Sequence, residues 1–154
     1  MTKINFVCHG NICRSPMAEF LMKDLLVKKG LEKRYEVCSR ATSSEELGNP
    51  VHYGTRKILD RLNISYAGKR AEKLLKSDYD KYDYFVGMDG ANISNMRRLF
   101  DGDKDNKVYL LLDFAGQNRD VADPWWTGDF QQTYADVKTG VEAFLQFLLN
   151  QQNK

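Results

Sequence analysis

A cysteine and an arginine separated by five residues, Cys8 and Arg14, carry most of the chemistry that this sequence suggests. An apolar run at residues 4–7 is typical of a buried strand, and residues 17–22 resemble the start of a helix. A loop that joins a strand to a helix N-terminus makes an anion cradle, because its N–H groups turn inward and the helix dipole adds positive charge. We therefore expect residues 8–16 to bind an oxyanion.

The chemistry that this arrangement favours is nucleophilic attack on phosphorus. A thiol beside a helix N-terminus and a cation ionises readily, so Cys8 is the candidate nucleophile. The planar fork of Arg14 can hold two phosphate oxygens and stabilise charge in the transition state. The alternatives are that Cys8 is inert and that Arg14 is an ordinary surface residue. The positive end of the helix dipole disfavours an arginine here unless an anion lies between the guanidinium and the helix N-terminus.

The residues between and beside this pair are turn-forming. Asn11 tolerates left-handed backbone geometry and Gly10 adds conformational freedom. Ser15 is a candidate N-cap, with Pro16 at the first helical position. Ordinary turn chemistry remains an alternative for each of them. The candidate anion-binding loop comprises His9, Gly10, Asn11, Ile12, Cys13 and Ser15.

Composition limits the class of protein. The 154 residues suit one domain, and a net charge of +2 is too small to suggest nucleic-acid binding. The apolar stretches are too short for a membrane span, and the N-terminus does not resemble a secretory signal. Three cysteines do not make a disulfide framework, and an activated thiol suits the cytoplasm. His9 and His52 lack metal-ligand spacing with the cysteines, so we expect no metal and no cofactor.

Apolar β-type runs alternate with helical patterns along the chain. Strands are predicted at residues 4–8, 35–39, 83–88 and 107–112, and helices at 17–30, 54–62, 74–82, 91–100 and 135–149. Strands that alternate with helices indicate an α/β fold with a parallel sheet covered on both faces. In such folds ligands bind beyond the carboxyl ends of the strands, which is where the Cys8 loop begins.

The segment CHGNICRSP (residues 8–16) resembles the phosphate-binding loop of the low-molecular-weight protein tyrosine phosphatases. The resemblance extends, in order along the chain, to Ser39 with Ala41-Thr42, to residues 48–50, to Met88-Asp89 and to Asp123-Pro124 followed by two aromatic residues. It implies a single domain (residues 1–154) with a four-stranded parallel sheet flanked by helices. It also implies metal-free hydrolysis of phosphotyrosine.

The resemblance implies a role for each matching residue. Cys8 would form a phosphocysteine, and Asp123 would protonate the phenolate leaving group and then activate water. Ser15 would hydrogen-bond the thiolate, while Asn11 would brace the loop through Ser39. The family's thiol at the position of Cys13 forms a reversible disulfide with the nucleophile, which implies redox protection here.

Trp125 and Trp126 directly follow the Asp-Pro pair. Two adjacent tryptophans in an exposed loop are costly unless they pack or bind something, and they fit as walls of a slot for a phosphotyrosine ring. A satellite core cluster is the alternative. Better-known relatives have tyrosines here, so this chain lacks those tyrosines as phosphorylation switches.

Three further positions depart from the family pattern and concern substrate preference. His9 takes a rim position that is aliphatic in many relatives, and Glu45 falls where some relatives place an aromatic wall residue. Lys69 falls roughly where many carry a histidine that pairs with the aspartate matching Asp89. The expected substrates are phosphotyrosine proteins or small aryl phosphates, with phosphate as a product inhibitor. No nucleic-acid or membrane partner is expected, and the oligomeric state is left open.

Three other functions remain as alternatives. An arsenate reductase of the same fold needs two further cysteines, but only Cys38 lies beyond the loop. Protein arginine phosphatases resembling this chain carry threonine where Ile12 stands, and an apolar residue favours an aryl phosphate. A silent phosphoprotein-binding module would not need the acid Asp123.

Overall fold

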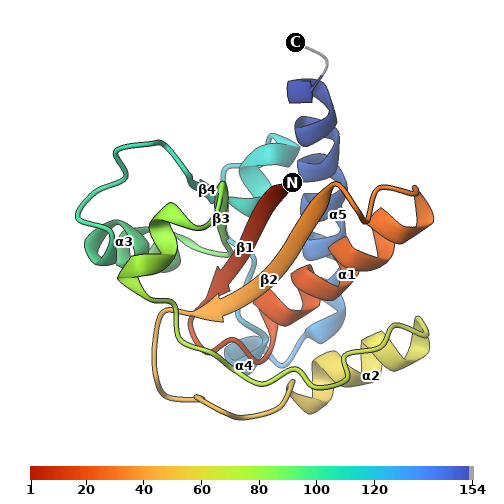
Figure 1. The fold of residues 1–154 in the computed structure, drawn as a ribbon. Coiled ribbons are helices and arrows are strands. Elements are labelled where there is room, and N and C mark those ends of the chain that lie inside the picture. The colour runs from red at the N-terminus through yellow and green to blue at the C-terminus, as the bar shows by residue number, and fades with distance from the viewer. Residues whose placement is uncertain (153–154) are drawn as a thin grey trace.

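Four parallel strands form the centre of the protein in the computed structural model, which describes residues 1–152 (Figure 1). The sheet has the order β2-β1-β3-β4. The strands are β1 (Thr2–Cys8), β2 (Tyr35–Ala41), β3 (Tyr84–Gly87) and β4 (Val108–Leu110). The predicted α/β fold with a four-stranded parallel sheet is confirmed.

Helices cover both faces of this sheet. Long helices α1 and α5 pack on one face, while α3 and a short 3₁₀ helix pack on the other (Figure 1). The helices are α1 (Arg14–Lys28), α2 (Tyr53–Arg61), α3 (Gly90–Leu99), α4 (Pro124–Thr127) and α5 (Phe130–Gln152), with 3₁₀ helices at Lys76–Asp80 and Leu111–Ala115. No helix within residues 1–152 is long and apolar enough to cross a lipid bilayer.

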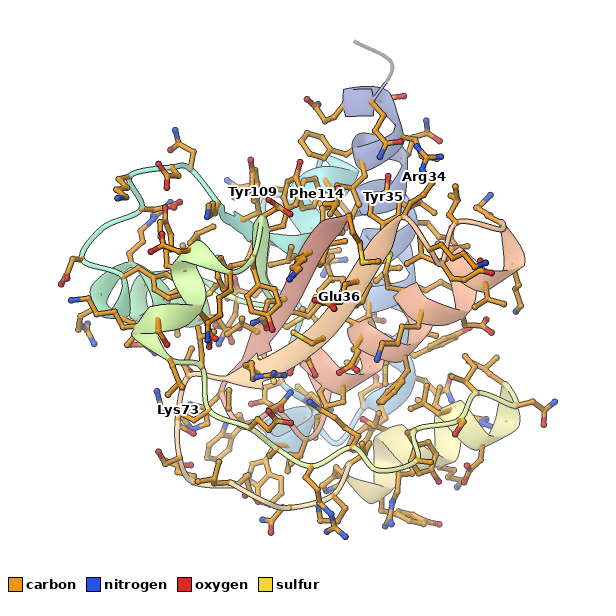
Figure 2. The ribbon with its side chains drawn as sticks, viewed as in Figure 1. Arg34, Tyr35, Glu36, Lys73, Tyr109 and Phe114 are labelled. Atoms are coloured by element: carbon orange, nitrogen blue, oxygen red, sulfur yellow. The ribbon has the colours of Figure 1, made fainter. Side chains whose placement is uncertain are left out.

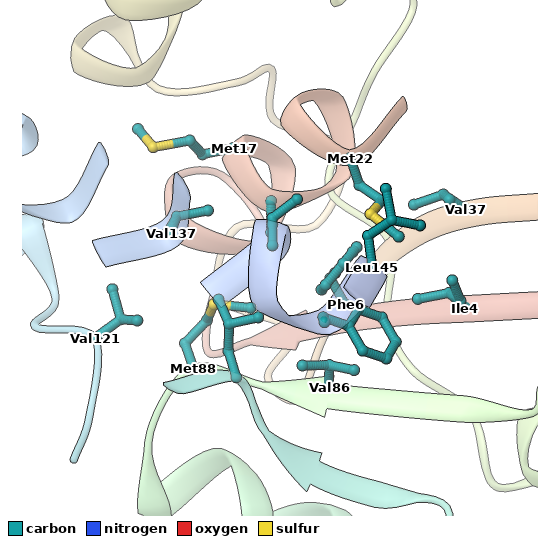
Figure 3. Packing of buried hydrophobic residues seen from close by; sticks show 14 of the residues in the cluster. Ile4, Phe6, Met17, Met22, Val37, Val86, Met88, Val121, Val137 and Leu145 are labelled. Carbon is teal, nitrogen blue, oxygen red and sulfur yellow. The ribbon is translucent and has the colours of Figure 1, made fainter. Parts of the chain in front are cut away.

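Side chains alternate along the strands, so the sheet contributes buried residues to the hydrophobic clusters on both of its faces. Ile4 and Phe6 of β1 face α1 and α5, whereas Val7 joins the cluster under α3. Phe6 is fully buried, and its ring meets the ring of Phe144 on α5 edge-on, with 6.0 Å between the centroids. Figure 3 shows Phe6 between β3 and the helices of this face, next to Val86. Burial on both sides explains why the central strand lacks the polar alternation of a half-exposed sheet.

Several predicted boundaries were wrong, and the largest differences fall in three elements. The predicted strand at 107–112 ends at Leu110, because residues 111–115 turn into a 3₁₀ helix. Leu111 and Leu112 are buried in that turn, so the apolar run did not distinguish strand from helix. The first helix begins at Arg14 rather than residue 17, and the last spans residues 130–152 rather than 135–149.

The carboxyl ends of the parallel strands share one edge of the sheet. Figure 2 shows Arg34 and Tyr35 at the amino end of β2 and Lys73 beside its carboxyl end. Cys8 and Ala41 end β1 and β2 in register, and Figure 1 shows α4 just beyond the tip of β1. The loops that follow the strands therefore gather around the end of β1.

Candidate active site

The loop between β1 and α1 is held from outside by the segment that follows β2. Three N–H groups of that segment donate to loop carbonyls: Thr42 to Cys8 at 3.0 Å, Ser43 to His9 at 3.1 Å and His52 to Ile12 at 2.8 Å. Because these carbonyls point outward, the loop can turn N–H groups toward its centre. The N–H of Asn11 does so, lying 3.3 Å from the Cys8 sulfur. Asn11 adopts the left-handed conformation, with a φ of 60°, as its residue type allows.

The Cys8 sulfur lies at the floor of a cavity of about 380 Å³. The Ser15 hydroxyl is 3.0 Å from this sulfur and accepts a hydrogen bond of 2.8 Å from the Asn11 side chain. Ser15 lies inside the first turn of α1, whose N-cap position is Cys13 without a side-chain cap. The prediction of Ser15 as N-cap was wrong, because its hydroxyl is engaged with the thiol and Asn11.

Asn11 holds the loop to two other parts of the chain. Its side-chain amide also donates to the Ser39 hydroxyl at 2.9 Å, and its side-chain oxygen accepts from the N–H of Glu72 at 3.0 Å. The Ser39 hydroxyl then donates to Glu19 at 2.6 Å. Both partners of this last bond are buried, so the contact between β2 and α1 is fully desolvated and costly to leave unpaired.

Glu19 is a site residue that sequence reasoning missed. Its carboxylate accepts the hydrogen bond from the Ser39 hydroxyl. The carboxylate also lies 2.6 Å from the Lys23 amine and 3.6 Å from the Lys69 amine. Lys69 also donates to the backbone oxygen of Ser39 at 3.0 Å, so this departure from the family pattern contacts β2 as well as α1. Burial lowers the pKa of Lys69. The available signal was a carboxylate one helical turn after Ser15, on an otherwise apolar stretch of helix.

Arg14 is buried beneath the cavity and held from two sides. It donates to the Asp89 carboxylate at 2.7 Å and to the Val121 carbonyl at 3.0 Å, and lies 3.5 Å from Asp123. Burial lowers the pKa of Arg14, but the charges of Cys8, Asp89 and Asp123 outweigh burial and raise that pKa. The guanidinium therefore stays charged and oriented, ready for an oxyanion.

Asp89 was quoted in the family pattern but not predicted as a site residue. It follows β3 and caps α3, with one carboxylate oxygen accepting from the N–H of Asn92 at 2.8 Å. Its other oxygen binds Arg14, so the helix cap also fixes the direction of the guanidinium. The signal in the sequence was its place directly after a strand, at the sheet edge where the Cys8 loop begins.

Asp123 and the two tryptophans approach the cavity from α4. One oxygen of Asp123 accepts from the N–H of Trp125 at 3.0 Å, and the other faces Arg14. Trp125 and Trp126 line the cavity with 57% and 83% of their surface exposed. Neither belongs to a buried cluster of the described chain, which argues against the satellite-core alternative.

The structure brings together most of the predicted site residues. The cavity is lined by Cys8, His9, Gly10, Ile12, Cys13, Arg14, Glu45, Glu46, Asp89, Ala91, Asn92, Asn95, Asp123, Trp125 and Trp126. Asn11, Ser15 and Ser39 lie behind this surface as the hydrogen-bonded support. Within residues 1–152, no group of three or more His, Cys, Asp or Glu side chains is arranged to hold a metal ion.

Cys13 lines the same cavity as Cys8, and both thiols are free and buried. Burial, followed by the charge of Cys8, raises the pKa of Cys13 to about 12. Cys13 is therefore a neutral thiol at physiological pH, whereas a nucleophilic cysteine must be a thiolate.

Comparison with known proteins identifies the family. The family model for low molecular weight phosphotyrosine protein phosphatase matches residues 3–154. The chain is 40% identical over 147 residues to the low molecular weight protein-tyrosine-phosphatase YfkJ of Bacillus subtilis, covering 94% of each chain. It is 36% identical over 154 residues to PtpA of Staphylococcus haemolyticus, a protein of the same description, covering 99% of this chain and 97% of the relative.

Solved structures agree with the sequence comparison. The crystal structure of YfkJ superposes with a TM-score of 0.95 at 38% identity, covering 98% of this chain and 96% of that one. SP-PTP of Streptococcus pyogenes gives a TM-score of 0.86 at 41% identity, covering 96% and 93%. The protein belongs to the low molecular weight phosphotyrosine protein phosphatase family.

Proposed function

We propose that this protein hydrolyses phosphotyrosine in proteins, or small aryl phosphates, through a phosphocysteine formed on Cys8. The observation that carries the proposal is the position of the Cys8 sulfur at the floor of the cavity, 3.0 Å from the Ser15 hydroxyl and 3.3 Å from an inward N–H group. These donors stabilise a thiolate, and the charged guanidinium of Arg14 lies beside it.

In the first step the Cys8 thiolate forms a bond to phosphorus while the bond from phosphorus to the phenolic oxygen breaks. Asp123 supplies the proton that the departing phenolate takes up. Arg14, oriented by Asp89, binds the equatorial phosphoryl oxygens as negative charge spreads over them. The products of this step are a neutral phenol and the phosphocysteine.

In the second step water attacks the phosphocysteine. Asp123, now a carboxylate, takes a proton from that water, and the bond between sulfur and phosphorus breaks. Ser15 donates to the departing sulfur and so stabilises the returning thiolate. Inorganic phosphate leaves, and because it fits the same loop we expect it to inhibit as a product.

The cavity supports an aryl substrate. Trp125 and Trp126 line the cavity, and we expect them to flank the phosphotyrosine ring, because aromatic rings stack favourably with each other. A phosphoserine side chain is too short to touch these walls while its phosphate reaches Cys8. We expect Ile12, which also lines the cavity, to favour an aryl group over a guanidinium.

The arsenate reductase alternative receives little support from the positions of the thiols. Such a relay would pass a disulfide through further cysteines, whereas the half-buried Cys38 lies outside the lining of the cavity. Burial raises the pKa of Cys38, which makes it a poor attacking thiol. The binding-module alternative leaves unexplained why Asp123 faces the cavity.

We further propose reversible protection of Cys8 by Cys13. Peroxide would oxidise the Cys8 thiolate to a sulfenic acid, and the Cys13 sulfur would displace water from it to form a disulfide. The negative charge of the Cys8 thiolate helps to raise the pKa of Cys13. Oxidation of Cys8 to the neutral sulfenic acid removes this charge, so Cys13 becomes easier to ionise once Cys8 is oxidised.

The test of this protection is mild peroxide treatment followed by peptide mapping by mass spectrometry. We expect a Cys8–Cys13 disulfide and recovery of activity with dithiothreitol. The Cys13→Ser variant should keep turnover but become irreversibly inactive sooner. If the wild type yields only Cys8 sulfonic acid at every peroxide dose, the protection does not operate.

We assign the protein to the cytoplasm, where its nucleophilic thiol would stay reduced, and treat residues 1–154 as one catalytic domain. The proposed steps use side chains alone, so EDTA should leave the rate unchanged.

The deciding experiment compares matched phosphotyrosine and phosphoserine peptides, with and without EDTA, and traps the phosphoenzyme by rapid acid quench. We expect much higher kcat/KM for phosphotyrosine and a label on Cys8. Equal kcat/KM for both peptides would contradict the proposed substrate, and a label elsewhere would contradict the mechanism.

A further inference from the structure

The mouth of the cavity is acidic. Four acidic side chains line the cavity, from Glu45, Glu46, Asp89 and Asp123, and the only lining lysine or arginine among residues 1–152 is Arg14. Asp89 and Asp123 face Arg14, which leaves Glu45 and Glu46 for the mouth. Arg14 is buried at the floor, where it already pairs with Asp89. A phosphotyrosine side chain carries close to two negative charges at neutral pH, so it must pass acidic side chains on its way to the thiolate. Such a charge pattern favours a substrate that brings its own cations.

Glu45 is available to bind such a cation. Its side chain is 71% exposed, and its carboxylate lies 3.0 Å from the His9 ring, which is itself half exposed. An exposed pair of this kind is weak, so a substrate cation can replace the histidine at little cost.

Glu46 is fixed close to the phosphate-binding loop. A Cβ added to Gly10 would lie 3.2 Å from its Cγ, so the side chain passes directly over the loop backbone. The Asn49 amide donates to its carboxylate at 2.6 Å and holds it there. Glu46, held by Asn49, and Glu45, weakly paired with His9, thus place adjacent charges in the lining of the cavity.

Trp126 adds a second feature that suits a cation. Its ring is 83% exposed and lines the same cavity. The face of an exposed indole attracts a guanidinium more strongly than other aromatic faces do. An arginine beside the phosphotyrosine therefore has a carboxylate pair and an indole within the same mouth.

We propose that Glu45 and Glu46 make this protein selective for phosphotyrosine flanked by arginine or lysine. The inference rests on the proposed function and names the substrate class within it. The selectivity is electrostatic and acts at an exposed rim, so it should weaken as ionic strength rises.

The experiment measures kcat/KM for three phosphotyrosine peptides of equal length that carry arginine, glutamine or glutamate on both sides of the phosphotyrosine. The enzymes are the wild type, Glu45→Gln, Glu46→Gln and the double variant. Glu36→Gln is the matched control, because Glu36 is an exposed glutamate near the amino end of β2, away from the cavity (Figure 2). Each series is run at low and at physiological ionic strength.

We expect the wild type and Glu36→Gln to favour the arginine peptide over the glutamate peptide by about tenfold at low salt, the combined effect of two weak exposed pairs. The double variant should reduce this ratio to about twofold, and each single variant should give an intermediate ratio. The ratio of the wild type should also fall toward that of the double variant at higher salt.

Two results would overturn the inference: equal kcat/KM for the three peptides with the wild type, or an unchanged ratio in the double variant. Glu45→Lys is the second test, since reversing the charge should move the preference toward the glutamate peptide. The proposed function fails in a different way, because the wild type would then hydrolyse none of the three peptides.

Discussion

The floor and the rim of the cavity are built in opposite ways. Cys8 and Arg14 on the floor, and Asn11 and Ser15 directly behind it, are buried. Each is hydrogen-bonded or lies within hydrogen-bonding distance of its neighbours. At the rim, the side chains are exposed and make few contacts, as Trp126 shows with 83% of its surface free.

This difference separates the reaction from the choice of substrate. Buried polar groups must be paired, and pairing from several elements holds the floor in one arrangement before substrate arrives. Exposed side chains carry little such constraint, so the rim can change its charge or shape without disturbing the thiol. The floor should therefore respond to substitution with large losses of kcat, and the rim with smaller, substrate-dependent changes of kcat/KM.

The largest effect is expected for Cys8→Ser on the floor. A serine hydroxyl does not ionise in this loop, so turnover should fall to the rate of buffer alone. Phosphate should still bind with similar affinity, because Arg14 and the loop N–H groups remain. Steady-state kinetics check the loss of turnover, and titration with phosphate by calorimetry checks the affinity. Measurable turnover by the variant would contradict the assignment of Cys8 as the nucleophile.

Asp123→Ala should lower kcat by about 10²–10⁴ for a phenol that leaves poorly without a proton, the usual range for a general acid. The loss should shrink for a phenol that departs readily unprotonated. Asp129→Ala is the matched control, because Asp129 accepts from the N–H of Gln132 at the start of α5 but does not line the cavity. An equal loss for both phenols would show that Asp123 is not the proton donor.

Asn11→Ala should cost about 1–3 kcal/mol of folding free energy through lost buried hydrogen bonds, and kcat should fall as the loop loosens. Asn11→Gly loses the same bonds but accepts the left-handed φ of 60° without strain. Urea unfolding should therefore rank the glycine variant above the alanine variant in stability. Equal stabilities would mean that backbone strain contributes little here.

The smallest effect is expected at the rim. Trp126→Ala should reduce kcat/KM for aryl phosphates by an amount equivalent to about 0.5–1.5 kcal/mol, from the lost ring contact. Trp126→Phe keeps an aromatic ring and should lose less. Unchanged kinetics in the alanine variant would remove Trp126 from the substrate slot and weaken the contrast between floor and rim.

The part of the floor that the sequence predicted is the local part. Cys8, Arg14 and the turn-forming residues between them occupy one short segment, where residue type and spacing directly suggest an anion-binding loop. The start of α1 was misplaced within that same segment. Ser15 is a good capping residue by type, but its hydroxyl is used by the thiol, and a local rule cannot anticipate that competition.

The sequence by itself determined the parallel α/β fold and the pairing of a thiol with an arginine, because hydrophobic periodicity and turn chemistry act over a few residues. Only the tertiary structure decided which carboxylates hold Arg14, since Asp89 and Asp123 lie 75 and 109 positions away in the chain. It also decided that Glu19 supports the loop through Ser39 and that Glu46 joins Glu45 in the lining of the cavity. These contacts depend on parallel strands ending at one edge of the sheet, a long-range alignment that no local pattern encodes.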